Sequence, residues 1–277
     1  IKKMGVECHQ EPNLEAWNNF LAKLSSATKE VKIGLVGKYV ELQDAYKSIS
    51  ESLSHAATYN DHKLKLVYIH SEKLTDKDVE EKLSDMDGVI IAPGFGQRGI
   101  EGKFVAIKWC RENDIPTFGI CLGMQCIVIE YARNVLGLAD ANSTEMDTAT
   151  KNNVIDLMEE QKGISNMGGT MRLGAYDCEL HPESKAAKAY GKTLVSERHR
   201  HRFEFNSDFR ARFEEAGMKC VGENPKTHLV EVVEIPEKRW FVGTQYHPEY
   251  QSTVLDPNPL FMDFIKAAIA FKEEKNK

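Results

Sequence analysis

The feature that most constrains the fold is a strand–turn–helix junction centred on Cys121. The sequence there is Gly119-Ile120-Cys121-Leu122-Gly123-Met124-Gln125. A short extended run ends before Cys121 and a helical apolar pattern follows it, so the cysteine occupies a tight turn. The flanking glycines permit strained backbone and close approach, and the helix N-terminus favours thiolate over thiol. The junction predicts an exposed nucleophilic cysteine, and a buried structural cysteine is the alternative that the motif alone leaves open.

Strands and helices alternate through the first half of the chain. We expect strands at 31–37, 64–69, 88–92 and 116–120, and helices at 44–58, 76–83, 102–113 and after Leu122. In the second half we expect strands at 169–180, 193–204, 219–221, 228–234 and 240–246, and a helix at 259–271. The predicted fold class is therefore α/β, with an open, mostly parallel sheet, helices on both faces and an additional β-rich portion in the second half.

The ends of the chain and one central segment depart from this pattern. Residues 1–30 are predicted to be a linker or leader with an amphipathic helix capped by Asn13, and residues 31–277 a single domain. The polar segment 139–165 is expected to form a long excursion or lid, and the charged tail 272–277 to fray. Because the chain starts at Ile1 and not at Met, we expect a fragment of a longer polypeptide or a processed chain.

Composition narrows the possible functions. The net charge of −6 argues against a nucleic-acid-binding surface, although the run from Glu197 to Arg202 is locally basic. No apolar stretch is long enough to span a membrane, and no signal peptide is present. The six cysteines lack framework spacing and contain no C-x-x-C pair. They predict reduced thiols in a cytoplasmic protein, and no zinc site.

A candidate base and its orienting group follow the last predicted strand, in His247-Pro248-Glu249. Proline ends the strand, and residues two apart in extended backbone point the same way, so Glu249 can reach the His247 ring. A cysteine nucleophile needs a base that is held by a third group, which makes Cys121, His247 and Glu249 a candidate triad. Taken singly, His247 and Glu249 are equally compatible with ordinary surface residues.

A glycine-rich turn, Pro93–Gly99, follows the third predicted strand. Ligands of parallel sheets bind at the carboxyl ends of the strands, which places this turn beside Cys121 as a candidate oxyanion hole. A plain surface turn is the alternative. Gly94–Gly99 also spells G-x-G-x-x-G, but it does not follow the first strand and no acidic residue ends the next one, which disfavours dinucleotide binding.

Arginine and histidine alternate in the strand pattern near residue 200. The alternation places Arg198, Arg200 and Arg202 on one face, and His199 and His201 on the other. Two histidines could ligate a metal but lack an obvious third ligand. A solvated basic edge and an arginine clamp for a carboxylate are the other two interpretations.

Taken together, these motifs resemble the class I glutamine amidotransferases. The Cys121 elbow and the His-Pro-Glu sequence are shared within that family. Further segments resemble the glutaminase domains of CTP synthases, in family order and over nearly the whole chain from Val31 to about residue 270. These segments are 36–48, 141–145, 167–174 and 197–204.

The resemblance implies a role for each site residue. Cys121 would attack the side-chain amide of L-glutamine and form a thioester, His247 would accept and return the proton, and Glu249 would orient His247. The N–H of Leu122 and one N–H of the glycine-rich turn would stabilise the oxyanion. The residues that would bind glutamine are Gly94, Leu122, Gly123, Met124, Gln125, Glu145 and Arg202.

The glycine-rich turn departs from the family pattern Pro-Gly-Gly-Phe-Gly, because this chain has Ala92-Pro93-Gly94 in the place of Pro-Gly-Gly. The unchanged spacing from Asp87 favours replacement over deletion. Because proline has no N–H, the oxyanion donor from this turn is expected to be Gly94 or Phe95.

The resemblance also implies a larger enzyme of pyrimidine biosynthesis. Full-length members join this domain to a synthetase domain that makes CTP from UTP with ATP and Mg²⁺, with GTP as activator and a homotetramer as the assembly. That half is absent here, so this chain is expected to hydrolyse glutamine without cofactor or metal and to make no CTP. Arg98 and the segment 167–174 are candidates for communication between the halves. The alternatives are another class I cysteine amidohydrolase, and a catalytically silent assembly or regulatory domain.

Overall fold

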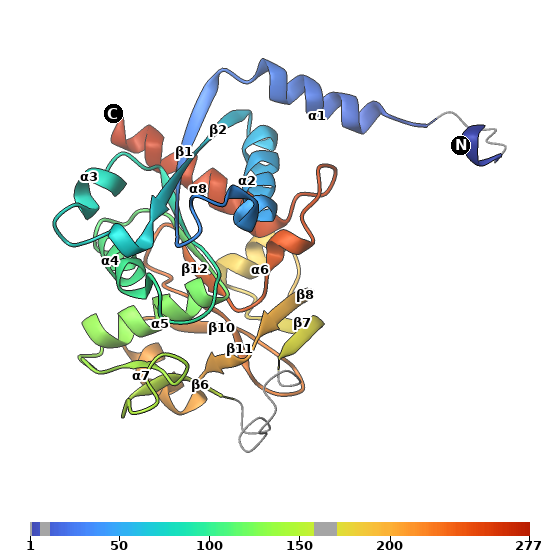
Figure 1. Ribbon diagram of the computed structural model, residues 1–277. Coiled ribbons are helices and arrows are strands. Elements are labelled where there is room, and N and C mark those ends of the chain that lie inside the picture. Colours follow the sequence, from blue (N-terminus) through green and yellow to red (C-terminus); the bar gives the residue numbers. More distant parts are fainter. Residues whose placement is uncertain (1, 6–11, 158–170) are drawn as a thin grey trace.

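A sheet of nine strands runs through the part of the chain that the computed structural model describes, residues 2–5, 12–157 and 171–277 (Figure 1). Its strand order is β2 (His62–His70), β1 (Lys29–Gly37), β3 (Gly88–Ile91), β4 (Thr117–Ile120), β12 (Phe241–Thr244), β11 (Val230–Glu234), β10 (Lys219–Glu223), β7 (Arg172–Leu180) and β8 (Leu194–His201). The pairs from β2 to β12 are parallel and those from β12 to β8 are antiparallel. The predicted fold class is confirmed, and the β-rich portion extends the parallel sheet.

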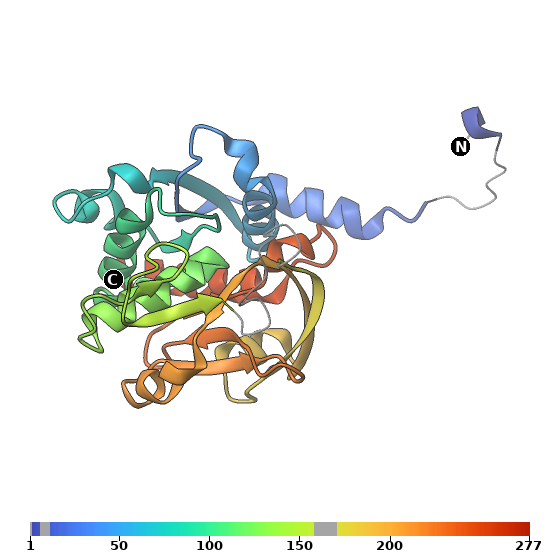
Figure 2. The same ribbon diagram turned by 60° about the horizontal axis from the view of Figure 1, so that its bottom comes forward.

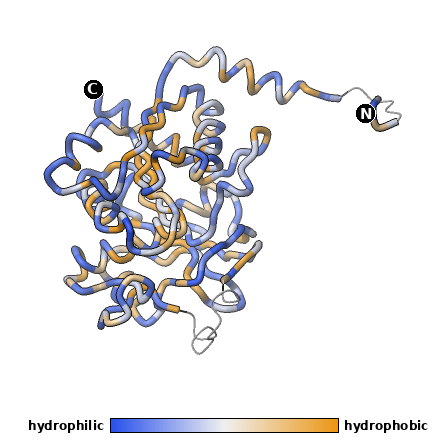
Figure 3. Tube along the Cα trace, in the orientation of Figure 1, coloured by the Kyte–Doolittle hydropathy of each residue, from blue (hydrophilic) through white to orange (hydrophobic). Residues whose placement is uncertain are grey.

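Helices cover both faces of the parallel half. They are α2 (Lys47–Tyr59), α4 (Ile100–Glu112), α5 (Leu122–Asn134) and α8 (Pro259–Lys275), together with the short α3 (Val79–Leu83). Ile90 and Ile91 are neighbours in β3 but pack into opposite cores, Ile90 with α2 and α8 and Ile91 with α4 and α5. Every residue of β3 and β4 is buried, which explains their unbroken apolar sequences. Figure 3 shows the hydrophobic residues concentrated along these central strands.

The second half contains elements that the sequence patterns did not predict. They are the helices α6 (Lys185–Tyr190) and α7 (Arg210–Glu215), and a small sheet of β5 (Asn142–Ser143), β6 (Asn153–Leu157) and β9 (Phe203–Phe205). The single strand expected at 193–204 is divided at Arg202, because β8 pairs with β7 whereas β9 pairs with β6. The lid expected at 139–165 therefore begins as β5 and β6, and its remainder from 158 on lies outside the described residues.

A helix lies near each end of the described chain. The tail expected to fray at 272–277 instead continues α8 to Lys275, because the Lys272 ammonium bonds to the Glu30 carbonyl at 2.8 Å and lies 3.3 Å from the Asp87 carboxylate. At the other end α1 (Glu15–Ser26) projects from the body of the molecule (Figures 1 and 2). Only Phe20 of α1 is buried, and it packs against α2. No helix in the described ranges is long and apolar enough to cross a membrane.

Candidate active site

Cys121 stands in a strained turn between β4 and α5. Its φ of 53° and ψ of −107° lie in a region that residues with side chains rarely adopt. A Cβ on Gly123 would lie 2.0 Å from the Ile91 carbonyl oxygen, and one on Gly119 would lie 2.8 Å from the Gly123 carbonyl carbon. Both glycines are therefore required by the close approach of helix and strands, as the sequence predicted.

The Cys121 side chain is not exposed, contrary to our expectation. Only 2% of the residue is accessible. The end of β8 lies over the turn, and the Cys121 sulfur faces the Arg200 carbonyl oxygen at 3.9 Å. Any substrate must therefore reach the sulfur through a cavity in the protein surface.

The parallel pairing of β4 with β12 brings His247 to this turn. Ile120 pairs with Thr244, and the Cys121 amide donates to the Thr244 carbonyl at 2.7 Å. His247 follows β12 by three residues, and its amide donates to the Arg198 carbonyl of β8 at 2.8 Å. The histidine is thus fixed between the parallel and antiparallel halves of the sheet.

Glu249 holds the far side of the His247 ring. Its Oε1 lies 2.7 Å from His247 Nδ1, and both residues are buried. We expected extended backbone to bring the two side chains together. The contact instead arises from a 3₁₀ turn at Pro248–Tyr250. The turn also stacks the Tyr250 ring on His247, with centroids 4.8 Å apart and planes at 11°.

The charges around His247 favour its protonated form. Burial alone would lower the pKa of His247, but its interactions with the Cys121 sulfur and the Glu249 carboxylate outweigh burial and raise it to about 11. His247 therefore interacts with both the sulfur and the carboxylate, and its charged form is the favoured one. This arrangement is the one that a cysteine nucleophile with a histidine base requires.

Two buried glutamines connect the Cys121 turn to the neighbouring strands. Gln125 Nε2 donates to the Phe203 carbonyl at 2.8 Å and to Gln245 Oε1 at 3.1 Å, and Gln245 Nε2 lies 3.7 Å from the Cys121 sulfur. Sequence reasoning overlooked Gln245, although a polar residue that ends an apolar strand two positions before His247 was an available signal. The NH₂ group of Gln125 is engaged within the protein, so only its amide oxygen can face a ligand.

A cavity of about 370 Å³ lies beside this turn, although Cys121, His247 and Glu249 are not among the residues that line it. It is lined by Gly94, Phe95, Gln125, Glu145, Met171, Arg200, His201, Arg202 and Phe203. Four of the residues predicted to bind glutamine therefore share one cavity, which carries both an acidic and a basic side chain. Leu122, Gly123 and Met124 do not line it, because Leu122 and Met124 pack into the core beneath and Gly123 faces β3.

Two buried lysines hold the glycine-rich turn at the cavity edge. Lys103 Nζ donates to the Ala92 carbonyl at 2.5 Å, and Lys38 Nζ donates to the Phe95 carbonyl. The Gly96 amide donates to Glu145 Oε1 at 3.0 Å, so this N–H is already engaged. The N–H groups of Gly94 and Phe95 remain the candidate oxyanion donors from this turn. Sequence reasoning overlooked both lysines because lysine is ordinarily exposed, whereas they are 1% and 5% accessible.

A buried ionic cluster lies behind the cavity. The expected alternation is confirmed within β8, where His199 and His201 are buried and Arg198 and Arg200 are exposed, whereas Arg202 follows the strand and is half-buried. His199 Nδ1 lies 2.8 Å from His201 Nε2, and His199 Nε2 lies 3.0 Å from a Glu231 carboxylate oxygen. His201 Nδ1 lies 3.4 Å from the Glu204 carboxylate. The histidines thus contact each other and carboxylates, and no group of three or more His, Cys, Asp or Glu among the described residues could hold a metal.

Arg172 lies closer to one of the two glutamates of this cluster than to the other. Its guanidinium lies 2.6 Å from Glu231 and 3.6 Å from Glu204. Burial raises the pKa of Glu204 to about 8, and Arg172 lowers it only in part. Burial thus favours the protonated form of the Glu204 carboxyl group.

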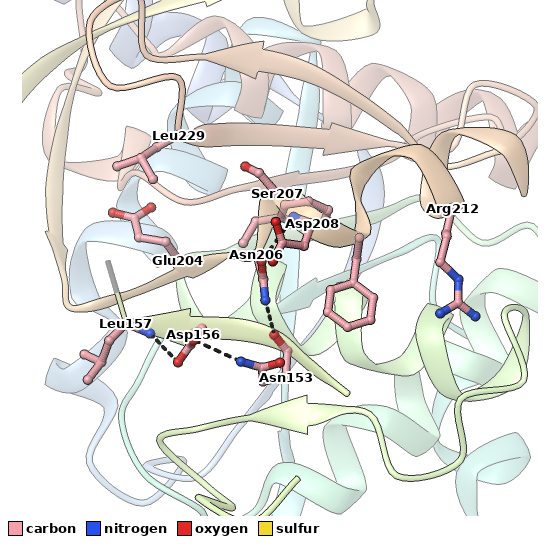
Figure 4. A pocket seen from close by; sticks show the side chains of 11 residues that line it. Asn153, Asp156, Leu157, Glu204, Asn206, Ser207, Asp208, Arg212 and Leu229 are labelled. Carbon is pink, nitrogen blue, oxygen red and sulfur yellow. Dashed lines mark hydrogen bonds between the residues drawn. The ribbon is translucent and has the colours of Figure 1, made fainter. Parts of the chain in front are cut away.

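A second cavity, of about 560 Å³, is larger than the one at Cys121 (Figure 4). It lies between β6 and the segment that follows β9, where Asn206 donates to the Asn153 carbonyl at 3.0 Å and Asn153 to Asp156 at 2.9 Å. None of the predicted site residues lines it. The candidate site is therefore identified by its chemistry and not by cavity size.

The residues expected to communicate with a second half are only partly described. Arg98 contacts the Glu72 carboxylate at 2.5 Å and lies over the Tyr39 ring at 5.1 Å. Of the segment 167–174, positions 167–170 lie outside the described residues. The described cysteines, at 110, 121, 126, 178 and 220, are unpaired.

Sequence comparisons place this geometry among known proteins. The family described as glutamine amidotransferase class-I matches residues 41–267. CTP synthase of Bacteroides fragilis is 65% identical over 269 residues, which cover 97% of this chain and 50% of that protein. CTP synthase of Porphyromonas gingivalis is 62% identical over 274 residues, 99% of this chain and 51% of that protein. The chain thus spans about half the length of the curated relatives that it matches.

A solved structure gives the same result. The glutaminase domain of Trypanosoma brucei CTPS, with bound acivicin, superposes with a TM-score of 0.82 at 37% sequence identity. The match covers 87% of this chain and 94% of that one.

Proposed function

This chain belongs to the class I glutamine amidotransferase family, as a glutaminase domain of the CTP synthase type, and we propose that it hydrolyses the side-chain amide of L-glutamine with Cys121 as nucleophile. The observation that carries the proposal is that His247 interacts with both the Cys121 sulfur and the Glu249 carboxylate, with Nδ1 2.7 Å from Glu249, and that the sulfur faces the carbonyl of Arg200, a residue that lines the neighbouring cavity.

The reaction begins with the proton of the thiol held on His247, and the Cys121 sulfur attacks the amide carbon of glutamine. The N–H of Leu122 and that of Gly94 or Phe95 stabilise the negative oxygen of the tetrahedral intermediate. His247 then gives its proton to the amide nitrogen, the C–N bond breaks, and ammonia leaves a glutamyl thioester on Cys121. Water deprotonated by His247 hydrolyses the thioester, which yields glutamate and restores the thiol.

Substrate recognition needs groups of both signs, because free glutamine is a zwitterion. Glu145 and Arg202 supply an acid and a base at the cavity, and the amide oxygen of Gln125 supplies an acceptor. A carboxylate is bound well by guanidinium, which supports Arg202 as the partner of the substrate carboxylate and Glu145 as that of its ammonium. This half of the reaction needs neither cofactor nor metal.

We further propose that the ammonia serves a synthetase half of the same polypeptide, which makes CTP from UTP with ATP and Mg²⁺. The proposal is supported by relatives named CTP synthase that are about twice as long as this chain. Activation by GTP, a homotetrameric full-length enzyme and a cytoplasmic location belong to the same proposal, and the unpaired cysteines support the last of these.

The test is glutamate release from glutamine by the wild-type chain and by Cys121→Ala, with Cys220→Ala as control because Cys220 lies away from the cavity. We expect release by the wild type and the control, and none above background by Cys121→Ala. Equal rates in all three would refute Cys121 as nucleophile. Release that is absent from all three would favour a catalytically silent domain.

A further inference from the structure

The Gln245 side chain is a buried amide beside the nucleophile that the proposed mechanism leaves without a role. The residue is 0% accessible, and its Nε2 lies 3.7 Å from the Cys121 sulfur. Gln125 Nε2 donates to Gln245 Oε1 at 3.1 Å. Because the oxygen end of the Gln245 amide is occupied by this donor, the N–H end is the one that faces the sulfur.

We propose that Gln245 is a further catalytic residue, which donates an N–H hydrogen bond to the Cys121 sulfur and thereby favours and aims the attacking thiolate. The inference rests on the proposed function, since it assigns a role within the same site. It adds a contact on the nucleophile itself, from the residue that directly follows β12.

Two neighbours of the sulfur favour opposite protonation states. The Arg200 carbonyl, at 3.9 Å, can only accept, so it favours the thiol, whose S–H can donate to it. The Gln245 amide can donate to either state, but hydrogen bonds strengthen when the acceptor is charged. Gln245 therefore offsets the carbonyl and shifts the balance toward thiolate, in the same direction as the His247 imidazolium.

Gln125 fixes the orientation of the Gln245 side-chain amide. Its NH₂ group connects the Phe203 carbonyl, at 2.8 Å, to the Gln245 oxygen. A free amide could rotate and present its oxygen to the sulfur, where it would repel a thiolate. With its oxygen held by Gln125, the Gln245 amide keeps its donor toward Cys121.

The test compares Gln245→Met, which preserves size but removes the donor, with Gln251→Met as a matched control. Gln251 is exposed and donates to the Ser196 carbonyl at 2.7 Å, away from the sulfur. Alkylation of Cys121 by iodoacetamide is followed over a range of pH by peptide mass spectrometry. We expect Gln245→Met to slow alkylation about tenfold at neutral pH, as loss of one hydrogen bond to a charged group implies, and to recover the wild-type rate at high pH.

Gln245→Glu, which places a carboxylate oxygen against the sulfur, is expected to slow alkylation further, and Gln251→Met to leave it unchanged. Wild-type rates at every pH in Gln245→Met would overturn the proposal, since a merely space-filling amide predicts that result. Alkylation does not require turnover. Failure of the glutaminase assay would refute the proposed function without deciding this question.

A measurement on the unsubstituted Gln245 covers the case in which its variants do not fold. In the ¹⁵N-labelled wild-type chain, alkylation of Cys121 removes the thiolate acceptor and is expected to shift the side-chain amide resonance of Gln245 and not that of Gln251. An unchanged Gln245 resonance would overturn the proposal independently of any substitution.

Discussion

Replacing Lys103 with Met should make the protein more stable and less active. Lys103 is buried in α4, and within the described part of the chain its ammonium donates one hydrogen bond, to the Ala92 carbonyl at 2.5 Å. Transfer of such a charge out of water costs several kcal/mol, whereas a hydrogen bond of a charged donor contributes about 1.5–3 kcal/mol. Methionine fills a similar volume without the charge. We therefore expect the free energy of unfolding to rise by about 1–3 kcal/mol, or about 2–4 °C in Tm for each kcal/mol.

The pH dependence of this gain identifies its cause. Burial lowers the pKa of Lys103 in the folded protein. Between that lowered pKa and the pKa of an unfolded lysine, the unfolded state binds more protons, so wild-type stability rises with pH. The advantage of Lys103→Met should therefore be largest at low pH and should shrink as the pH increases. Urea denaturation at several pH values, with Lys108→Met on the same helix as control, measures it.

The loss of activity follows from the turn that Lys103 holds. Without this anchor, the Gly94 and Phe95 N–H groups are no longer fixed opposite Cys121, and a full oxyanion donor is worth about 10²–10³-fold in kcat. We expect Lys103→Met to lower kcat for glutamine about 10- to 100-fold, with little change in KM. A variant that is less stable than wild type and fully active would refute this reasoning on both counts.

Three further substitutions test other parts of the account. Glu249→Gln should lower kcat about 10²–10⁴-fold, because His247 loses the carboxylate that orients it; a loss below threefold would contradict that role. Gly123→Ala should lower the free energy of unfolding by about 3 kcal/mol or more, because its Cβ would lie 2.0 Å from the Ile91 carbonyl; an unchanged urea midpoint would show that the helix can move. Glu204 has a folded-state pKa raised to about 8, so its contribution to stability is present at low pH and is lost as the pH rises through that value. Glu204→Gln should remove this pH-dependent loss of stability. If the free energy of unfolding of Glu204→Gln fell by the same amount as that of the wild type while the pH rose to about 8, the prediction would be contradicted.

The parts of the site that the sequence predicts are those set by local constraints. The glycines around Cys121 predict a strained turn. Strands that alternate with helices predict a parallel sheet, and the carboxyl ends of its strands bring Cys121 and His247 together. Gln245 and Lys103 could not be assigned in this way. Gln245 lies 124 positions from Cys121 in the chain, and its contact depends on the register of β12 against β4. The burial of Lys103 depends on how α4 packs, and lysine in a helix ordinarily faces water.

The strand pattern near residue 200 shows a similar limit. Alternation correctly placed the histidines on the buried face and Arg198 and Arg200 on the exposed one. It could not show that the chain leaves one sheet at Arg202 and joins another as β9. That change of sheet brings Arg202 and Phe203 to the cavity, and it is determined by pairing with distant strands.

The central claim is that Cys121 forms a covalent bond with the substrate. The most direct measurement is an acid quench of the wild-type chain during turnover of isotopically labelled glutamine, followed by peptide mass spectrometry. A labelled glutamyl adduct on the Cys121 peptide, absent from Cys121→Ala, is the predicted result. Glutamate release without any adduct on Cys121, or with an adduct on another residue, would contradict the account.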